Sequence, residues 1–260
     1  EERVGIVSVE VTELGGKRCV LVAINDITEK QLYEKEIARL DQLNIVGEMA
    51  AVIGHEIRNP MTTVRGFLQI LSGKEDCAKY KDYYGLMIEE LDRANSIVAE
   101  FLSLAKDRVV ALNYHNLNAI LEALFPLIES DALMHDQYIT MELGVIPSLL
   151  VDGKDIRQLI LNLVRNGLEA MPPGGILAIK THQDGAELVL TFQDQGNGIE
   201  PNILEKLGTP FLTTKKNGTG LGLAVCYSIA ARHNAKIQVE TCPKGTTFSV
   251  RFKVPEVSKL

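Results

Sequence analysis

The sequence predicts an α+β protein: a short N-terminal β-hairpin, then a helical hairpin, then an α/β sandwich. Two observations carry this prediction. Apolar residues recur every three or four positions along about 29–71 and 78–106, which is typical of amphipathic helices. From about residue 117 onward, helical stretches instead alternate with short strand-like runs, which favours helices packed on one face of a mixed sheet.

Composition excludes several classes of protein. The 260 residues, 46% hydrophobic and 23% charged, exceed one average domain and suit a folded chain with two units. A net charge of −7 argues against nucleic acid or an anionic membrane as the main partner. The four cysteines form no Cys-x-x-Cys pair, so a reducing cytosol fits best. Because no apolar run approaches the ~18 residues that span a bilayer, we expect this part to be cytoplasmic, and any membrane anchor to lie upstream.

The N-terminal residues predict two strands. Residues 4–13 and 18–25 are rich in valine and isoleucine and flank a Leu14-Gly15-Gly16-Lys17 turn signal. Two strands are marginal alone, so we expect residues 1–27 to be the tail of a larger domain. The segment 22–29 resembles the closing Asp-Ile-Thr segment of PAS sensor domains, and Asp26 or Thr28 can cap the helix that follows.

One histidine in the first long helix lies off its apolar stripe. The stripe passes through Ile53 and Ile57, and at ~100° per residue His55 points away from both. Asn59 shares the outward face with His55, while Glu56 adjoins the ring and can orient it or accept a proton. Pro60 removes a helical hydrogen bond, so we expect a kink beside this site. Taken alone, the pattern also fits an ordinary solvated histidine.

The two long helices carry stripes too wide to bury against each other alone. Joined by a short loop after Ser72-Gly73-Lys74, they predict an antiparallel hairpin. We expect a second chain to complete a four-helix bundle, so homodimerisation follows as a prediction. The alternative is that the hairpin packs onto the downstream domain of its own chain.

After an expected linker at 107–115, the second half alternates between helices and strands. Helices are expected at about 117–134, 153–171 and 219–233, and strands at about 138–143, 148–151, 176–182, 187–193, 236–241 and 246–253.

Two polar clusters of this half suit a nucleotide. Asn162 and Asn166 are one helical turn apart, and amide oxygens are hard ligands that suit Mg²⁺. Asp194, with Gly196 and Gly198, places a carboxylate after a strand beside a backbone free to take unusual torsions. Each cluster alone is also compatible with ordinary polar surface or a tight turn.

Two further clusters follow in a loop and at a helix start. Pro210-Phe211-Leu212-Thr213-Thr214-Lys215-Lys216 offers an aromatic anchor, hydroxyls and ammonium groups. Gly218-Thr219-Gly220-Leu221-Gly222 precedes a helix, where glycines let backbone amides approach an anion.

Taken together, these motifs resemble the bacterial sensor histidine kinases over about residues 28–255. The order of that family's H, N, G1, F and G2 boxes is matched by His55-Glu56-x-x-Asn59-Pro60, Asn162-x-x-x-Asn166, Asp194-x-Gly196-x-Gly198, Pro210-Phe211 and Gly218-x-Gly220-x-Gly222. The stretch 55–68 particularly resembles the sporulation sensor kinases of Bacillus-type bacteria. Gly167 departs from the alanine common in the family, which removes no ligand.

The resemblance implies three parts and a reaction. These are a PAS-like remnant at 1–27, a dimerisation and phosphotransfer domain at 28–108 and a Bergerat-type ATP-binding domain at 113–258. By this analogy His55 attacks the γ-phosphate of ATP, assisted by Glu56, and Asn59 matches the position that orients water for the reverse reaction.

The same resemblance implies binding residues and partners. Asn166 would hold Mg²⁺ with support from Asn162, and Asp194 would accept a hydrogen bond from the adenine amino group. The expected ATP-binding set is completed by Arg165, Gly196, Gly198, Phe211, Thr214, Lys215, Gly218, Thr219, Gly220, Leu221 and Gly222. The phosphoryl group would pass to an aspartate of a response regulator in a sporulation phosphorelay, and inhibitory proteins acting on the bundle are an open partner class.

Two alternatives share the ATP motifs. One is a nucleotide-gated conformational module, as in gyrase-like or chaperone-like proteins, and the other is a serine kinase of the anti-sigma type. The first needs no nucleophile at His55, and the second lacks a helical hairpin that bears such a histidine. Acid lability of the phosphoprotein separates both from a histidine kinase.

Overall fold

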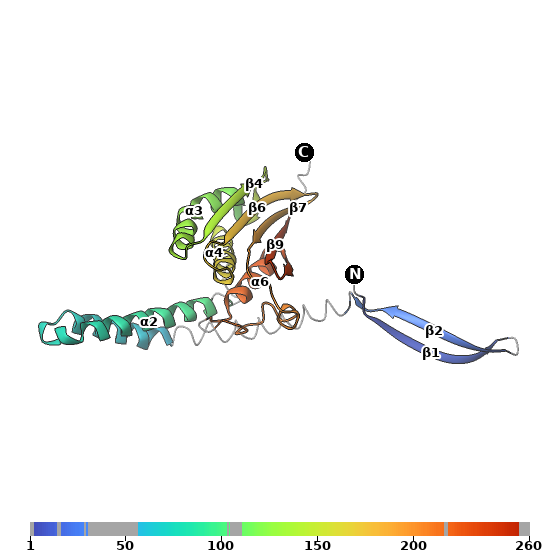
Figure 1. Cartoon of the computed structure of the whole chain (residues 1–260), viewed down its shortest axis with the longest axis horizontal. Coiled ribbons are helices and arrows are strands. Elements are labelled where there is room, and N and C mark those ends of the chain that lie inside the picture. The colour runs from blue at the N-terminus through green and yellow to red at the C-terminus, as the bar shows by residue number, and fades with distance from the viewer. Residues whose placement is uncertain are drawn as a thin grey trace. The chain divides into compact units, whose positions relative to one another are not determined.

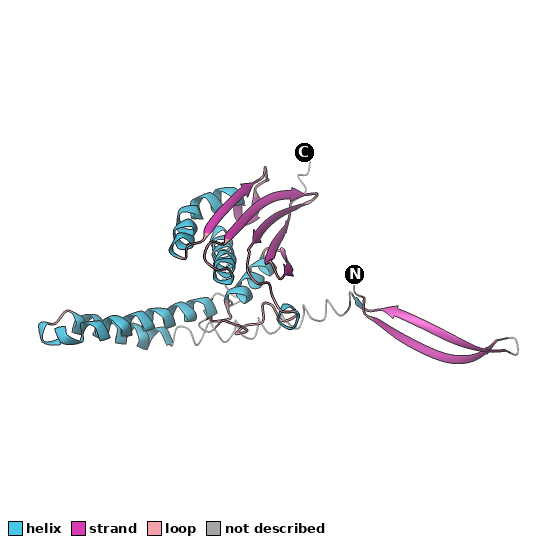
Figure 2. Ribbon diagram, viewed as in Figure 1, coloured by secondary structure: helices cyan, strands magenta, loops and turns pink. Residues whose placement is uncertain are grey.

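The structure is a computed structural model that describes residues 3–14, 17–28, 30, 57–102, 104, 111–215 and 218–254. The chain divides into two compact units, Glu1–Gln42 and Leu43–Leu260. Figure 1 labels the helices and strands, and Figure 2 colours the chain by secondary structure. Of the helices within the described residues, none combines the length and the apolar character needed to cross a bilayer.

The first unit contains the predicted β-hairpin. Strands β1 (Gly5–Leu14) and β2 (Lys17–Asp26) pair antiparallel, which confirms the strands expected on either side of the turn signal. The Asp26 carboxylate accepts hydrogen bonds from the amide of Thr28 (3.0 Å) and from its hydroxyl (2.6 Å). These bonds from Thr28 hold the pKa of Asp26 below its usual value. The apolar side chains of both strands are exposed, including Ile6, Val7, Val9, Val11, Val20, Leu21, Val22 and Ile24.

The second unit begins with the helical hairpin. Its first helix is described over residues 57–72, and a 3-10 turn, η1 (Glu75–Tyr80), leads into α2 (Lys81–Leu102). Arg65 Nε and Nη2 donate to the two carboxylate oxygens of Asp92 at 2.7 and 3.2 Å, which aligns the two helices. The hairpin is confirmed, although α2 starts at Lys81 because residues 75–80 close into the tighter turn. The kink expected at Pro60 lies next to residues 51–56, which are outside the described residues.

A five-stranded mixed sheet forms one layer of the sandwich. Its order is β4 (Tyr138–Leu143), β6 (Ile176–Asp184), β7 (Glu187–Gln193), β9 (Gly245–Lys253) and β8 (Lys236–Cys242). The β4–β6 pair is parallel and the other pairs are antiparallel. Buried and less buried residues alternate along β6 and β9, as expected when one face of a sheet packs on the core.

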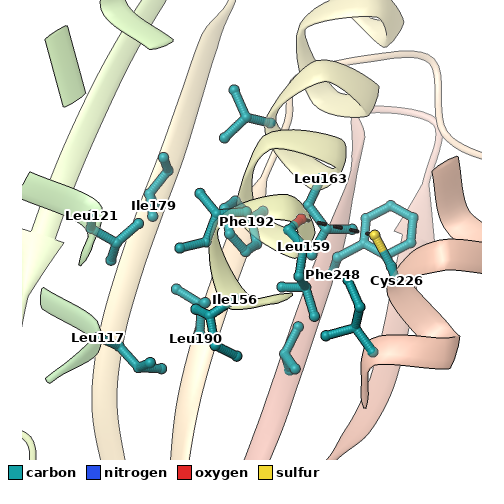
Figure 3. Packing of buried hydrophobic residues seen from close by; sticks show 14 of the residues in the cluster. Leu117, Leu121, Ile156, Leu159, Leu163, Ile179, Leu190, Phe192, Cys226 and Phe248 are labelled. Carbon is teal, nitrogen blue, oxygen red and sulfur yellow. Dashed lines mark hydrogen bonds between the residues drawn. The ribbon is translucent and has the colours of Figure 1, made fainter. Parts of the chain in front are cut away.

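Three helices cover one face of this sheet: α3 (Leu117–Met134), α4 (Gly153–Ala170) and α6 (Gly222–Arg232) (Figure 1). Figure 3 shows Leu159 and Leu163 of α4 directed toward Phe192 of the sheet, with Phe248 close by. Cys226 of α6 lies in the same core, and its burial raises the pKa of the thiol to about 12. The α/β sandwich expected from the sequence is confirmed.

A small second sheet was not predicted. Strand β3 (Asn113–His115) pairs antiparallel with β5 (Leu149–Val151), although residues 107–115 were expected to be a linker. The expectation was wrong for β3 because its pairing partner lies 34 or more residues further along the chain.

Asp152 joins the segment before β3 to the first turn of α4. Its side chain accepts hydrogen bonds from the amides of Ala111 (3.0 Å) and Lys154 (2.8 Å). Its own amide donates to Nε2 of His233 at 3.0 Å, the residue that ends α6. Asp152 therefore links the segment before β3 to the N-terminal end of α4 and to the C-terminal end of α6.

Two further boundaries differ from the prediction. Helix α6 begins at Gly222 instead of about residue 219, because Gly220 takes a left-handed φ of 68° that a helix cannot contain. A four-residue helix, α5 (Pro201–Leu204), lies in the segment that was expected to be a loop.

Candidate functional site

The predicted nucleophile lies outside the described residues, as does its neighbour Glu56. Asn59 is described and exposed on the first helix of the hairpin, where its carbonyl oxygen accepts a hydrogen bond from the hydroxyl of Thr63 (3.2 Å). Ile57 of the predicted apolar stripe is exposed as well, so the exposure of Asn59 does not distinguish the two faces of this helix.

The two asparagines of α4 differ in how their amides are used. Asn162 accepts a hydrogen bond from Gln158 Nε2 (2.9 Å) and donates one to the carbonyl oxygen of Gly222 (3.2 Å). Both ends of its amide are therefore engaged, and Asn162 ties α4 to the start of α6. By contrast, the amide nitrogen of Asn166 is buried and has no hydrogen-bond partner among the described residues. Asn166 therefore has hydrogen-bonding capacity that no described residue uses, whereas the amide of Asn162 is fully engaged.

Asp194 lies at the end of β7 with one of its carboxylate oxygens already engaged. Oδ1 accepts hydrogen bonds from the amides of Gly196 (2.8 Å) and Thr246 (3.1 Å), and the residue is 5% exposed. Burial raises the pKa of the Asp194 carboxyl, against the lowering influence of these amides and of the charge on Lys215. The two amides fix the plane of the carboxylate, which leaves Oδ2 as the oxygen suited to accept from a ligand.

The glycines after Asp194 permit close backbone approach. Gly198 has a left-handed φ of 76°, and a Cβ placed on it would lie 2.3 Å from the carbonyl oxygen of Cys242. A side chain at this position would push β8 away from the loop that follows Asp194.

The segment from Pro210 to Lys215 folds back on the glycine loop. Phe211 has a φ of 65°, is 60% exposed, and its amide donates to the carbonyl oxygen of Gly220 at 3.1 Å. The Thr213 hydroxyl accepts from the amide of Lys215 at 3.1 Å, while Thr214 is exposed. Lys215 extends back to α4, where its Nζ lies 2.5 Å from Glu169 Oε2.

The glycine loop leads directly into α6. Thr219 accepts a hydrogen bond from the amide of Leu221 (3.2 Å), and the Leu221 side chain is fully buried. A Cβ placed on Gly222 would meet nothing closer than Asn162 Cγ, at 4.0 Å, so this glycine is not required by crowding at its own position. Gly218 is exposed, and a Cβ there would meet the Thr213 hydroxyl at 2.6 Å.

The end of α2 also touches this region. The Thr219 hydroxyl donates to Glu100 Oε2 at 3.0 Å, and the rings of Phe101 and Phe211 lie 6.0 Å apart at 37°. The hairpin therefore contacts the Pro210–Lys215 segment through Phe211 and the glycine loop through Thr219.

The predicted site residues come from α4, the end of β7 and the loop before α6. Asn162 donates a hydrogen bond to Gly222 of the glycine loop, and the charge of Lys215 acts on Asp194. Arg165 is 69% exposed at its side chain and pairs with Glu169 through Nε at 3.0 Å. The donor set fits Mg²⁺ and a nucleotide: an amide with an unpartnered nitrogen, a carboxylate anchored by two amides, a lysine, and glycines directly before a helix start.

Sequence reasoning missed two contributors. Glu169, which pairs with both Arg165 and Lys215, was not among the residues that the sequence selected. Thr246 holds Asp194 through its backbone amide, and a main-chain contact 52 residues away leaves no signal in residue type.

Two family models match parts of the chain. Residues 45–108 match the His Kinase A (phospho-acceptor) domain, and residues 151–256 match the histidine kinase-, DNA gyrase B-, and HSP90-like ATPases.

Curated relatives are similar over most of the chain. Sporulation kinase C of Bacillus subtilis (strain 168) is 34% identical over 241 residues, covering 88% of this chain and 56% of that protein. Sporulation kinase A of the same organism is 36% identical over 245 residues, covering 93% of this chain and 40% of that protein. The chain thus spans about half the length of the curated relatives it matches.

Solved structures show the same architecture. Histidine kinase ThkA, in complex with the response regulator protein TrrA, matches with a TM-score of 0.59 and 28% identity, over 96% of this chain and 80% of that one. Full-length ShkA in complex with AMPPNP matches with a TM-score of 0.71 over 79% of this chain and 45% of that one; at 23% identity it supports the fold alone.

Proposed function

This chain belongs to the sensor histidine kinases, and on that premise we propose that it phosphorylates its own His55 from ATP and passes the phosphoryl group to a response regulator. One observation supports the proposal: a helical hairpin directly follows His55 in the sequence, and the same chain carries a sandwich in which Asp194 is anchored by two amides and Asn166 has an unpartnered amide nitrogen.

The first step is a phosphoryl transfer to nitrogen. A ring nitrogen of His55 forms the N–P bond while the bond from the γ-phosphorus to the β,γ-bridging oxygen breaks, and ADP leaves. Glu56 hydrogen-bonds the other ring nitrogen or accepts its proton, which raises the nucleophilicity of the imidazole. In the second step an aspartate oxygen of the response regulator takes the phosphoryl group, and His55 is restored.

The residues of the sandwich bind and orient the nucleotide. Asp194 Oδ2 accepts a hydrogen bond from the adenine amino group, because Oδ1 is held by two backbone amides. Asn166 holds Mg²⁺, which when bound offsets the charge that develops on the transferred phosphoryl group. Asn162 supports this site through Gly222, and Lys215 and the glycine loop face the phosphates.

The remaining residues assigned to the nucleotide follow from their positions. Arg165 lies next to Asn166 on α4 and contributes positive charge near the phosphates. Gly196 and Gly198 shape the loop after Asp194, and Phe211, Thr214, Gly218, Thr219, Gly220 and Leu221 form the lid that covers the nucleotide.

The proposed assembly is a homodimer. Several apolar residues of the hairpin are exposed, namely Ile57, Val64, Phe67, Ile70, Tyr83, Leu86, Met87 and Ile97. Burying them against a second hairpin gives a four-helix bundle, and the response regulator docks on that bundle. The β1–β2 pair belongs to a PAS-like sensor unit, and Asn59 supports dephosphorylation by orienting water.

The proposed setting is a sporulation phosphorelay in the cytosol. Similarity to sporulation kinases A and C supports it, and proteins that inhibit the kinase by binding the bundle are a further partner class.

The experiment is incubation of the purified chain with γ-labelled ATP and Mg²⁺, followed by acid and alkali treatment. Acid-labile, alkali-stable label that disappears in His55→Gln is expected, because a phosphoramidate hydrolyses in acid. His115→Gln is the matched control, since His115 lies in β3 and outside the proposed chemistry. Acid-stable label, or label that persists in His55→Gln, would refute the assignment. ATP binding without any label would instead favour a nucleotide-gated module.

A further inference from the structure

Glu169 binds two cations at once in the last turn of α4. Its Oε2 lies 2.5 Å from Lys215 Nζ, and its Oε1 accepts a hydrogen bond from Arg165 Nε at 3.0 Å. Arg165 is one helical turn away from Glu169. Lys215 is 46 residues further along the chain, between the lid residues Thr214 and Gly218. The contact with Lys215 is therefore a long-range tie between the lid and α4.

This tie borders the proposed nucleotide site. Glu169 is three residues beyond Asn166, so both side chains emerge on neighbouring parts of one helix face. Lys215 also lowers the pKa of Asp194 through its charge, so the lysine lies within electrostatic reach of both carboxylates. A triphosphate that extends from Asp194 toward Asn166 would meet the lysine while Glu169 still holds it.

The contact is not a freely solvated surface pair. The side chains of Lys215 and Glu169 are 37% and 38% exposed, so most of each is shielded from water. Burial acts to raise the pKa of Glu169, but hydrogen bonds from Lys215 and Arg165 outweigh it and leave the pKa below its usual value. Glu169 is therefore ionised at neutral pH and attracts the same lysine that a phosphate would attract.

We propose that Glu169 competes with the nucleotide phosphates for Lys215, so that it holds the lid lysine in the empty site and must release it when ATP binds. The inference rests on the proposed function. Two effects act in the same direction: the ion pair must break before Lys215 can reach a phosphate, and the carboxylate repels the incoming negative charge. Glu169 thereby lowers the affinity of the site for ATP more than for ADP. Adenosine has no phosphate, so neither effect changes its affinity.

The test compares nucleotide binding by the wild type and Glu169→Gln. Glutamine keeps the length of the side chain and removes its charge. Equilibrium binding of ATP, ADP and adenosine is measured by calorimetry at constant Mg²⁺. We expect Glu169→Gln to bind ATP about three- to tenfold more tightly, because half-exposed pairs contribute modest energies, with a smaller gain for ADP and none for adenosine.

Glu142→Gln is the matched control. Glu142 makes a comparable single pair, with Lys180 Nζ at 2.9 Å, but between strands β4 and β6 and away from the lid. Its removal should leave binding of all three ligands unchanged. In a Lys215→Met background Glu169→Gln should increase the affinity for ATP less, because no lysine remains for which the carboxylate and the phosphates compete.

The outcomes separate this inference from the proposed function. A wild-type chain that binds neither ATP nor ADP would overturn the proposed function itself. If the wild type binds ATP and Glu169→Gln binds it equally or more weakly, the competition is refuted and Glu169 instead positions Lys215 for phosphate. Unchanged adenosine binding in Glu169→Gln verifies that the site remains folded.

Discussion

Replacement of Gly198 by alanine tests how closely the loop after Asp194 must approach β8. The φ of Gly198 is 76°, and an added Cβ would lie 2.3 Å from the carbonyl oxygen of Cys242 and 2.9 Å from its carbonyl carbon. Both contacts are with backbone, so no side-chain rotation can relieve them. Either the loop or the end of β8 has to move.

The expected magnitude has two parts. A left-handed conformation disfavours alanine by about 1–2 kcal/mol. Overpacking against rigid neighbours adds about 1–3 kcal/mol, so the free energy of unfolding of the sandwich should fall by about 2–5 kcal/mol. Gly185→Ala isolates the first part, because Gly185 has a φ of 59° but an added Cβ meets nothing within 4 Å.

Native-state hydrogen exchange measures this difference locally. Peptides that cover β7 (Glu187–Gln193) report the opening of the sandwich core. Exchange there should accelerate about 5- to 30-fold in Gly185→Ala and about 30-fold or more in Gly198→Ala. Equal acceleration in the two variants would refute the argument, because it would mean that the loop accommodates a side chain without displacing β8.

Three other predictions follow from the site and the hairpin. Asp194→Asn keeps an oxygen for the two amides and loses the buried charge, so ATP binding should weaken by about 1–3 kcal/mol without lower stability at neutral pH. Folding raises the pKa of the Asp194 carboxyl above 3.8, so between 3.8 and the raised pKa the native state binds a proton that the unfolded state has lost. The free energy of unfolding of the wild type, measured in urea relative to Asp194→Asn, should therefore decrease as the pH rises through this range. Asn166→Ala should weaken ATP binding in Mg²⁺ much more than in excess chelator, and equal losses would argue against a metal ligand. Arg65→Ala should leave the thermal unfolding midpoint nearly unchanged, because its pair with Asp92 is exposed to solvent, and a large drop in the midpoint would contradict this.

Local patterns predicted most of the fold. The strand expected at 138–143 and the helix expected at 117–134 coincide with β4 and α3, because each has a clear periodicity and a polar stop. Strand β3 has no such pattern in its three residues, and only its neighbour β5 makes it a strand. The sequence therefore located the elements with a clear apolar pattern and missed two short ones, β3 and α5, which have none.

The candidate site was predictable where residue types carry the chemistry. Asp194 and Asn166 could be selected from motif order, and the structure adds the amide of Thr246 and the unpartnered nitrogen of Asn166. The pairing of Glu169 with Lys215 could not be predicted, since it depends on where the lid folds and not on spacing within either segment. Ion pairs between residues this far apart in the sequence can be identified only from a three-dimensional structure.

The hydrogen bonds of Asp152 give the sandwich a mechanical anchor. A displacement of the backbone at Ala111 acts on the Asp152 carboxylate through their hydrogen bond. The same carboxylate accepts from Lys154, so the displacement also acts on the first turn of α4. Through the Asp152 amide the same displacement reaches His233, at the far end of α6. In both helices it acts at the end opposite the polar residues, because Asn166 lies toward the end of α4 and the glycine loop precedes α6. Asp152 therefore connects the segment before β3 to the ends of α4 and α6 that lie opposite the proposed nucleotide site.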